Sequence, residues 1–311
     1  MSPLRIVFMG TPDFAVPCLN MLVNEGYEVQ AVVSQPDRPK GRGQKLTASP
    51  VKEAALAANL PVLTPERIRE TSFVDKMKEL DPDMIIVVAF GQFLPKTMLD
   101  IPRFGCINVH ASLLPQYRGA APIHWAIING ETKTGITTMF MDVGMDTGDM
   151  LLKAELPIGK DDTTGDLHEA LKELGASILS ETIRGIAKGT IARKPQDHQL
   201  ATYAPLLTRE TEKINWMKPA QDIHNLVRGL NPWPGSYCLH RGKNLKIWKT
   251  RLSSESLEVQ PGQLLLIHET VLVGTGSGCL ELVDIQPESK KRMAAVDYFR
   301  GHSNSGDNLL E

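Results

Sequence analysis

One segment, residues 83–90, restricts the fold of this chain more than any other. It reads Asp-Met-Ile-Ile-Val-Val-Ala-Phe and is apolar at nearly every position. Such a run is typical of a central parallel strand that is covered on both faces. The start of the chain agrees, because residues 4–9 and 28–34 are apolar strands separated by a helix that ends near Gly26. This order predicts an α/β fold with a doubly wound, mainly parallel, Rossmann-like sheet.

The last third of the chain has a different pattern. Residues 194–207 are polar and contain two prolines, which is typical of a linker. Short strands with close spacing follow at residues 236–239, 245–251, 263–267, 271–274 and 279–285, and they predict a small β-barrel resembling an oligonucleotide-binding (OB) fold. A chain of 311 residues is long enough for two domains. We therefore expect a first domain at 1–189, a linker at 190–206 and a C-terminal, OB-like barrel at 207–311.

A polar pair ends the apolar strand that follows Gly105. Side chains alternate along a strand, so Asn108 and His110 share one face near its carboxyl end. In open α/β sheets this edge is where ligands bind. An amide beside an imidazole suits polarising a carbonyl and handling one proton. The alternative is that both are ordinary strand-end groups that satisfy nearby backbone.

Residues 141–149 form a second polar feature, with three aspartates and two glycines. A calcium loop is the first idea, but the ligand spacing and the closing glutamate are missing. We expect a loop that lines a ligand, in which one aspartate orients His110 or interacts with its charge. A plain turn stays open for Asp142 and Asp149, because aspartate favours turns.

A basic segment follows the second strand. Its prolines and glycines exclude a regular element, so we expect an exposed loop on the ligand-binding edge. Arginine and lysine on such a loop suit phosphate contact; solvated surface charge is the alternative. The cations are Arg38, Lys40, Arg42 and Lys45. Gly91, at the end of the central strand, either leaves room for a ligand or serves a turn.

Several classes of protein and site are disfavoured. The turn after the first strand lacks Gly-x-Gly-x-x-Gly, which argues against a nicotinamide or flavin cofactor. Four cysteines without paired spacing suggest neither a disulfide framework nor a zinc site, and no other set of metal ligands is visible. The same cysteine usage fits a reducing cytoplasm best, so we expect a cytoplasmic protein. No apolar run approaches the ~20 residues of a membrane helix, so we expect no membrane contact. The net charge of −2 means that any contact with nucleic acid is local. No obligate protein partner is evident.

With these motifs in view, the whole chain resembles the methionyl-tRNA formyltransferase family. Asn-x-His with Ser-Leu-Leu-Pro alone would indicate only the wider folate formyltransferases, whereas the basic loop and the appended barrel point to the tRNA-dependent branch. The matching segments are Gly-Thr-Pro-Asp-Phe-Ala at 10–15, Gln-Pro-Asp-Arg-Pro at 35–39, His-Ala-Ser-Leu-Leu-Pro-Gln-Tyr-Arg-Gly-Ala-Ala-Pro at 110–122, Met-Asp-Val-Gly-Met-Asp-Thr-Gly at 141–148 and Asn-Pro-Trp-Pro at 231–234.

The resemblance implies a reaction and a set of residues. The donor would be 10-formyltetrahydrofolate as co-substrate, and the acceptor would be the α-amino group of methionyl initiator tRNA. The residues that match the catalytic trio are Asn108, His110 and Asp146. The implied folate segment comprises Ser112, Leu113, Leu114 and Pro115, and we add Phe90 and Gly91 at the neighbouring strand end. The implied tRNA loop holds the four basic residues named above.

The chain departs from the family pattern at Leu206, Asn215 and Ser289, of which the first puts a linker contact with tRNA in doubt. Two rival functions stay open. One is a nucleic-acid-binding protein without catalysis, in which the Asn108 strand is only structural. The other keeps the enzyme but changes the acceptor to a sugar amine or a small nucleotide.

Overall fold

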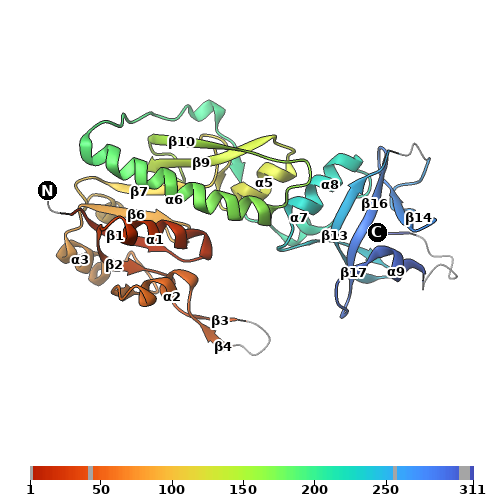
Figure 1. The fold of residues 1–311 in the computed structure, drawn as a ribbon, viewed down its shortest axis with the longest axis horizontal. Helices are drawn as coiled ribbons and strands as arrows, with labels where there is room; N and C mark the ends of the chain where they lie inside the picture. Colours follow the sequence, from red (N-terminus) through yellow and green to blue (C-terminus); the bar gives the residue numbers. More distant parts are fainter. Residues whose placement is uncertain (1–2, 41–44, 255–257, 301–308) are drawn as a thin grey trace. The chain divides into compact units, whose positions relative to one another are not determined.

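The computed structural model describes residues 3–40, 45–254, 258–300 and 309–311 (Figure 1). The chain forms two compact units. Unit 1 contains Met1–Gly119, Thr134–Pro157 and His168–Ala204, and unit 2 contains Ala120–Lys133, Ile158–Leu167 and Pro205–Glu311.

Unit 1 is built on a seven-stranded sheet in the order β10-β9-β7-β6-β1-β2-β5. Five neighbouring strands, from β5 to β7, are parallel, and β9 runs antiparallel to β7. The strands are β1 (Arg5–Gly10), β2 (Glu28–Val33), β5 (Val62–Leu63), β6 (Met84–Val88), β7 (Cys106–His110), β9 (Lys133–Phe140) and β10 (Met150–Pro157). The predicted α/β class with a mainly parallel sheet is confirmed.

Both faces of this sheet are covered. On one face, Val74 and Met77 of α3 pack in one cluster with Val7 and Val87 of the sheet. On the other face Gly175 of α6 lies against Val109, where an added Cβ would be 3.3 Å from the valine side chain. The helical segments are η1 (Asp13–Ala15), α1 (Val16–Asn24), α2 (Pro50–Ala57), α3 (Thr71–Leu80), α4 (Lys96–Leu99), α6 (Thr164–Lys188) and η2 (His198–Leu200). Every residue of β6 is buried, as its unbroken apolar sequence predicts.

Two short strand pairs complete unit 1. β8 (Arg118–Gly119) pairs in parallel with β11 (Tyr203–Ala204). β3 (Arg38–Lys40) pairs antiparallel with β4 (Lys45–Thr47), so the prediction that the basic segment holds no regular element was wrong. Proline excludes a central strand, but Pro39 lies in a pair of only two strands, where each strand is an edge.

Unit 2 contains an antiparallel sheet in the order β12-β13-β16-β15-β14, with β17 paired to β16. Its strands are β12 (Ser236–His240), β13 (Lys243–Leu252), β14 (Leu264–Ile267), β15 (Thr270–Gly274), β16 (Cys279–Pro287) and β17 (Met293–Ala294). The helices are α5 (Pro122–Ile128), α7 (Arg209–Glu212), α8 (Ala220–Gly229) and α9 (Ala295–Arg300). Ile223 and Val227 of α8 join Ile247 and Leu282 of the sheet in one core. The five predicted strands are present; their closure into a barrel stays a prediction.

Among the helices of the described ranges, none has the length and apolar character that crossing a membrane requires.

Candidate active site

The predicted polar pair lies on β7, as its alternating pattern requires. Asn108 is half-buried and pairs with Met139 of β9 and Val87 of β6, while His110 is 6% exposed and pairs with Thr137. Apolar neighbours on both sides hold the strand in the sheet. The two polar side chains therefore stand at a fixed spacing near the carboxyl end of β7.

Asp146 meets this pair. Its Oδ2 lies 3.7 Å from Nδ1 of His110 and accepts a hydrogen bond from the backbone N–H of Gly119 at 2.9 Å. Its Oδ1 accepts from Nδ2 of Asn108 at 3.5 Å. On the far side of the ring, Nε2 of His110 lies 2.9 Å from the carbonyl of Tyr117. A carbonyl only accepts, so Nε2 carries a proton and Nδ1 is the nitrogen that faces the carboxylate.

Two aspartates of the loop at residues 141–149 have different contacts. Oδ1 of Asp142 accepts from the backbone N–H of Gly144 at 3.0 Å and from the hydroxyl of Thr147 at 2.6 Å, which is the turn role left open for it. Asp146 has a φ of +52°, in the left-handed region that aspartate tolerates better than most residues. This conformation directs its carboxylate toward β7.

The segment of Ser112 to Pro115 is anchored from β9 and β10. The hydroxyl of Thr137 donates to the carbonyl of Ser112 at 2.7 Å and accepts from the N–H of Leu114 at 3.1 Å. The ammonium of Lys153 donates to the carbonyl of Leu114. Ser112 and Leu114 are buried, whereas Leu113 and Pro115 are half-buried. A ligand at this segment would meet the last two side chains and the backbone.

Lys153 itself has a perturbed environment. Partial desolvation, together with repulsion from Lys194, lowers the pKa of its ammonium, and nearby Glu155 opposes the shift. The neutral and the charged amine both donate hydrogen bonds, so the anchor to the Leu114 carbonyl persists in either state.

Phe90 and Gly91 lie at the end of β6. The ring of Phe90 is 2% exposed and packs in the apolar core, so only the backbone of this residue is placed to contact a ligand. Its carbonyl accepts from the hydroxyl of Thr11 at 3.1 Å and from Nε2 of Gln35 at 3.3 Å. Gly91 adopts a φ of +89°, which makes the turn explanation of this glycine sufficient.

The basic segment forms the β3–β4 pair. Nη2 of Arg38 lies 3.1 Å from a carboxylate oxygen of Glu66, and both side chains are largely exposed. The backbones of Lys40 and Lys45 pair with each other across the hairpin. Arg42 lies outside the described residues, so the structure gives no account of it.

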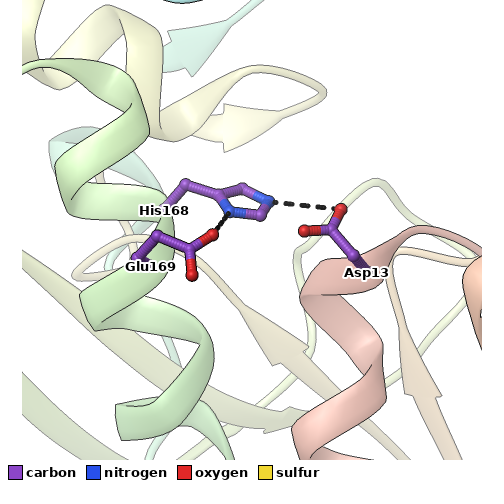
Figure 2. A group of neighbouring side chains, drawn as sticks. All are labelled: Asp13, His168 and Glu169. Carbon is purple, nitrogen blue, oxygen red and sulfur yellow. Dashed lines mark hydrogen bonds and ion pairs between the residues drawn. The ribbon is translucent and has the colours of Figure 1, made fainter.

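Three potential metal ligands gather elsewhere in unit 1, on η1 and α6 (Figure 2). Nδ1 of His168 lies 3.4 Å from Glu169, and Nε2 of the same ring lies 3.8 Å from Asp13. Glu169 also pairs with Lys172. Each ring nitrogen of His168 faces a different carboxylate, and a single ion could bind only one of the two nitrogens. We therefore interpret the group as a polar network linking η1 and α6.

Sequence reasoning missed the backbone partners of the trio. Arg118 and Gly119 form β8, and the α5 helix begins only at Pro122. The carbonyl of Tyr117 and the N–H of Gly119 thereby face His110 and Asp146. Backbone groups leave no trace in residue type, and the only signal was the Gly119 of the matching motif.

Comparisons with known proteins agree with this architecture. A family model described as formyl transferase matches residues 4–183, and another, described as formyl transferase, C-terminal domain, matches residues 206–303. Methionyl-tRNA formyltransferase of Alkaliphilus oremlandii is 50% identical over 308 residues, which cover 99% of each chain. The protein of the same name from Acetivibrio thermocellus is 52% identical over 301 residues, 96% of this chain and 97% of its own.

Solved structures share the fold at lower identity. The N-formyltransferase from Helicobacter canadensis, determined with folinic acid and dTDP-3-aminofucose, superposes with a TM-score of 0.70 at 21% identity, over 91% of this chain and 99% of that one. HypX from Aquifex aeolicus in complex with tetrahydrofolic acid gives 0.66 at 17% identity, over 98% of this chain and 48% of that one. The two family models together cover most of the sequence, and the relatives match it over nearly their full length. The chain therefore belongs to the formyl transferase family.

Proposed function

We propose that this enzyme transfers the formyl group of 10-formyltetrahydrofolate to the α-amino group of methionyl initiator tRNA, giving the N-formylmethionyl-tRNA used to initiate translation. One observation carries the proposal: the carboxylate of Asp146 reaches toward both Asn108 and His110 at the edge of the sheet. Relatives about half identical over nearly the whole chain bear the name of this activity.

The reaction needs no covalent enzyme intermediate. A free α-amine has a pKa of about 7.7–8.0, so a useful fraction is neutral and nucleophilic near neutral pH. The amine nitrogen attacks the formyl carbon, a carbon–nitrogen bond forms, and the bond to the folate nitrogen breaks. The amine loses one proton, and the departing folate nitrogen gains one.

Each member of the trio has a role in this scheme. Asn108 would donate to the oxygen that becomes negative as the amine adds. His110 would do so from Nδ1 when that nitrogen carries a proton, since Nε2 faces the Tyr117 carbonyl. Losing one such donor typically costs about 3 kcal/mol. Asp146 would hold the imidazole in place and accept the proton that leaves the amine, directly or through water. The distances of 3.5 and 3.7 Å to Asp146 are long for hydrogen bonds, and the proposed roles require these contacts to shorten in the reacting complex.

The remaining assignments belong to the same proposal. Folate would contact the segment from Ser112 to Pro115 and the end of β6 at Phe90 and Gly91. The cations of the β3–β4 segment, including Arg42, would contact tRNA phosphates, with further tRNA contact by the C-terminal domain. We keep the domain division at 189 and 207, and we place the protein in the cytoplasm, which fits four free, buried cysteines. The proposal needs no metal and no protein partner.

A direct assay tests the function. Purified protein is given 10-formyltetrahydrofolate with charged initiator tRNA, free methionine or a sugar amine in parallel. We expect formyl transfer only to charged tRNA. Transfer to the sugar amine alone would favour the rival acceptor. Binding of tRNA without measurable folate binding would favour a nucleic-acid-binding protein without catalysis.

A further inference from the structure

We infer that Gln196 is a positioning residue for Asp146, holding it through a buried hydrogen-bond chain that begins at Arg118; this inference rests on the proposed function. Gln196 is 7% exposed. Its Nε2 donates to the carbonyl of Asp146 at 2.8 Å and to the carbonyl of Gly148 at 2.8 Å. One amide group is thus hydrogen-bonded to two backbone carbonyls of the loop at residues 141–149.

Arg118 fixes which way this amide points. Its Nε and Nη2 donate to Oε1 of Gln196 at 3.1 and 2.6 Å, and Nη2 also lies 3.2 Å from Nδ1 of His198. A guanidinium only donates, so the amide oxygen has to face Arg118 and the amide nitrogen has to face the two carbonyls. Reversing the amide would break all four of the hydrogen bonds that Gln196 makes with Arg118 and the two carbonyls, and the orientation of Gln196 is therefore determined.

The burial of Arg118 strengthens the case that Gln196 is held in place. The side chain is 2% exposed, and none of its partners among the described residues is a carboxylate. A buried cation without an acid depends on neutral acceptors for its stability. Within the described ranges, Gln196 supplies one of two such acceptors, so any movement of Gln196 would cost hydrogen bonds at Arg118 as well as at the loop.

The two hydrogen bonds from Gln196 bear on the chemistry because they hold the backbone that sets the position of the Asp146 carboxylate. Its φ of +52° lies in the less populated left-handed region, which surrounding contacts help to maintain. Without the two bonds from Gln196, the Asp146 and Gly148 carbonyls lose their donor, and the loop has reason to relax. A displacement of about 1 Å at a reacting group can cost about 10²-fold in rate.

The segment that contains Gln196 also holds Tyr117, whose carbonyl lies on the other side of the His110 ring. The hydroxyl of Thr202 accepts from the N–H of Tyr117 at 2.9 Å, and the Thr202 carbonyl accepts from the N–H of Arg118 at 2.9 Å. Tyr117, whose carbonyl faces His110, has a φ of +58°. Residues 196–204, which lie in the segment with the polar composition of a linker, thus hold both neighbours of the imidazole.

Two substitutions separate positioning from general stability. Gln196→Met keeps the size of the side chain and removes every hydrogen bond. Gln196→Glu keeps an acceptor for Arg118, now charged, but an ionised carboxylate cannot donate to the Asp146 and Gly148 carbonyls. Gln199→Met is the matched control, because Gln199 belongs to the same segment and is exposed.

The full-length variants are assayed for kcat, for KM with charged tRNA, for folate affinity and for Tm. We expect kcat to fall about 10- to 100-fold in both Gln196 variants, with tRNA KM and folate affinity within about two-fold. Gln196→Glu should lose less Tm than Gln196→Met because it still pairs with Arg118, and Gln199→Met should match the wild type throughout. A folded Gln196→Glu variant with wild-type kcat would overturn the inference, and so would equal losses in kcat and in both affinities. A wild-type protein without formyl transfer would instead overturn the proposed function.

Discussion

Replacing Asp146 by Asn tests the centre of the proposed mechanism. The substitution keeps the shape of the side chain and an oxygen that can accept from the N–H of Gly119, but it removes the negative charge that lies 3.7 Å from the His110 ring. When His110 is protonated in the reaction, the interaction of unit charges at that distance is about 4 kcal/mol at an effective dielectric constant of about 20. The His110 and Asp146 side chains are only 7% and 17% exposed, so solvent screens a minor part of it.

Allowing for this screening, we expect transition-state stabilisation to fall by about 3 kcal/mol, which is about a 10²-fold loss of kcat. The assay is steady-state formyl transfer, with tRNA binding measured separately. Affinity for tRNA should stay within about two-fold, because Asp146 is assigned no contact with phosphate.

Asp142→Asn is the matched control from the same loop. Asp142 is exposed, and an asparagine oxygen can still accept from Gly144 and Thr147, so its kcat should stay near that of the wild type. The proposed role of Asp146 would be refuted if its variant lost kcat and tRNA affinity in equal measure. A kcat within about three-fold of the wild type would refute the assigned magnitude.

Three further changes give separate expectations. Arg42→Ala should weaken tRNA binding and reduce the slope of log affinity against log salt by about 1; an unchanged slope in a salt titration would contradict a phosphate contact. Gly119→Ala should lower both kcat and Tm, because a Cβ there would lie 2.7 Å from the carbonyl of Ala204 and the backbone has a φ of +119°; differential scanning calorimetry with the transfer assay checks this. Asp83→Asn should reduce the free energy of unfolding by about 2 kcal/mol near neutral pH. Hydrogen bonds from Arg5 lower the pKa of Asp83, so this stabilisation is present above the unfolded-state pKa of about 3.9 and is lost as pH falls through the folded-state pKa; urea unfolding at pH 7 and pH 3 should show the difference between variant and wild type shrink.

The sheet and the pair of Asn108 and His110 could be predicted from sequence because they follow from patterns within single strands. The unbroken apolar run at β6 predicts a strand buried on both faces, and Asn108 and His110 follow from alternation along β7. Each of these predictions needs only neighbours within one strand. The β3–β4 pair was missed because both strands are short and β3 contains Pro39. The prolines and glycines of the segment therefore predicted a loop, whereas the structure has a strand pair.

The choice among the three aspartates of the 141–149 loop could not be made from residue types. Asp142 and Asp146 differ only in what surrounds them, since one caps its own turn and the other faces His110. The resemblance to the family singled out Asp146, and the structure gives the physical reason: the N–H of Gly119 and the amide of Gln196 hold its side chain and backbone. Both partners come from distant parts of the chain.

The polar segment at residues 194–207 shows why such hydrogen-bond partners cannot be predicted from sequence. Gln196 and Thr202 have the composition of a solvated connection, yet the first is buried and both satisfy backbone groups beside the imidazole. A polar side chain that serves buried carbonyls looks the same in sequence as one that serves water. The distinction emerges only from the structure, in which Arg118 is a buried cation whose side-chain partners, in the part of the chain that the structure describes, are neutral acceptors. If this account holds, changes in this segment should alter the rate of formyl transfer before they alter the binding of either substrate, which a flexible connection between domains would not do.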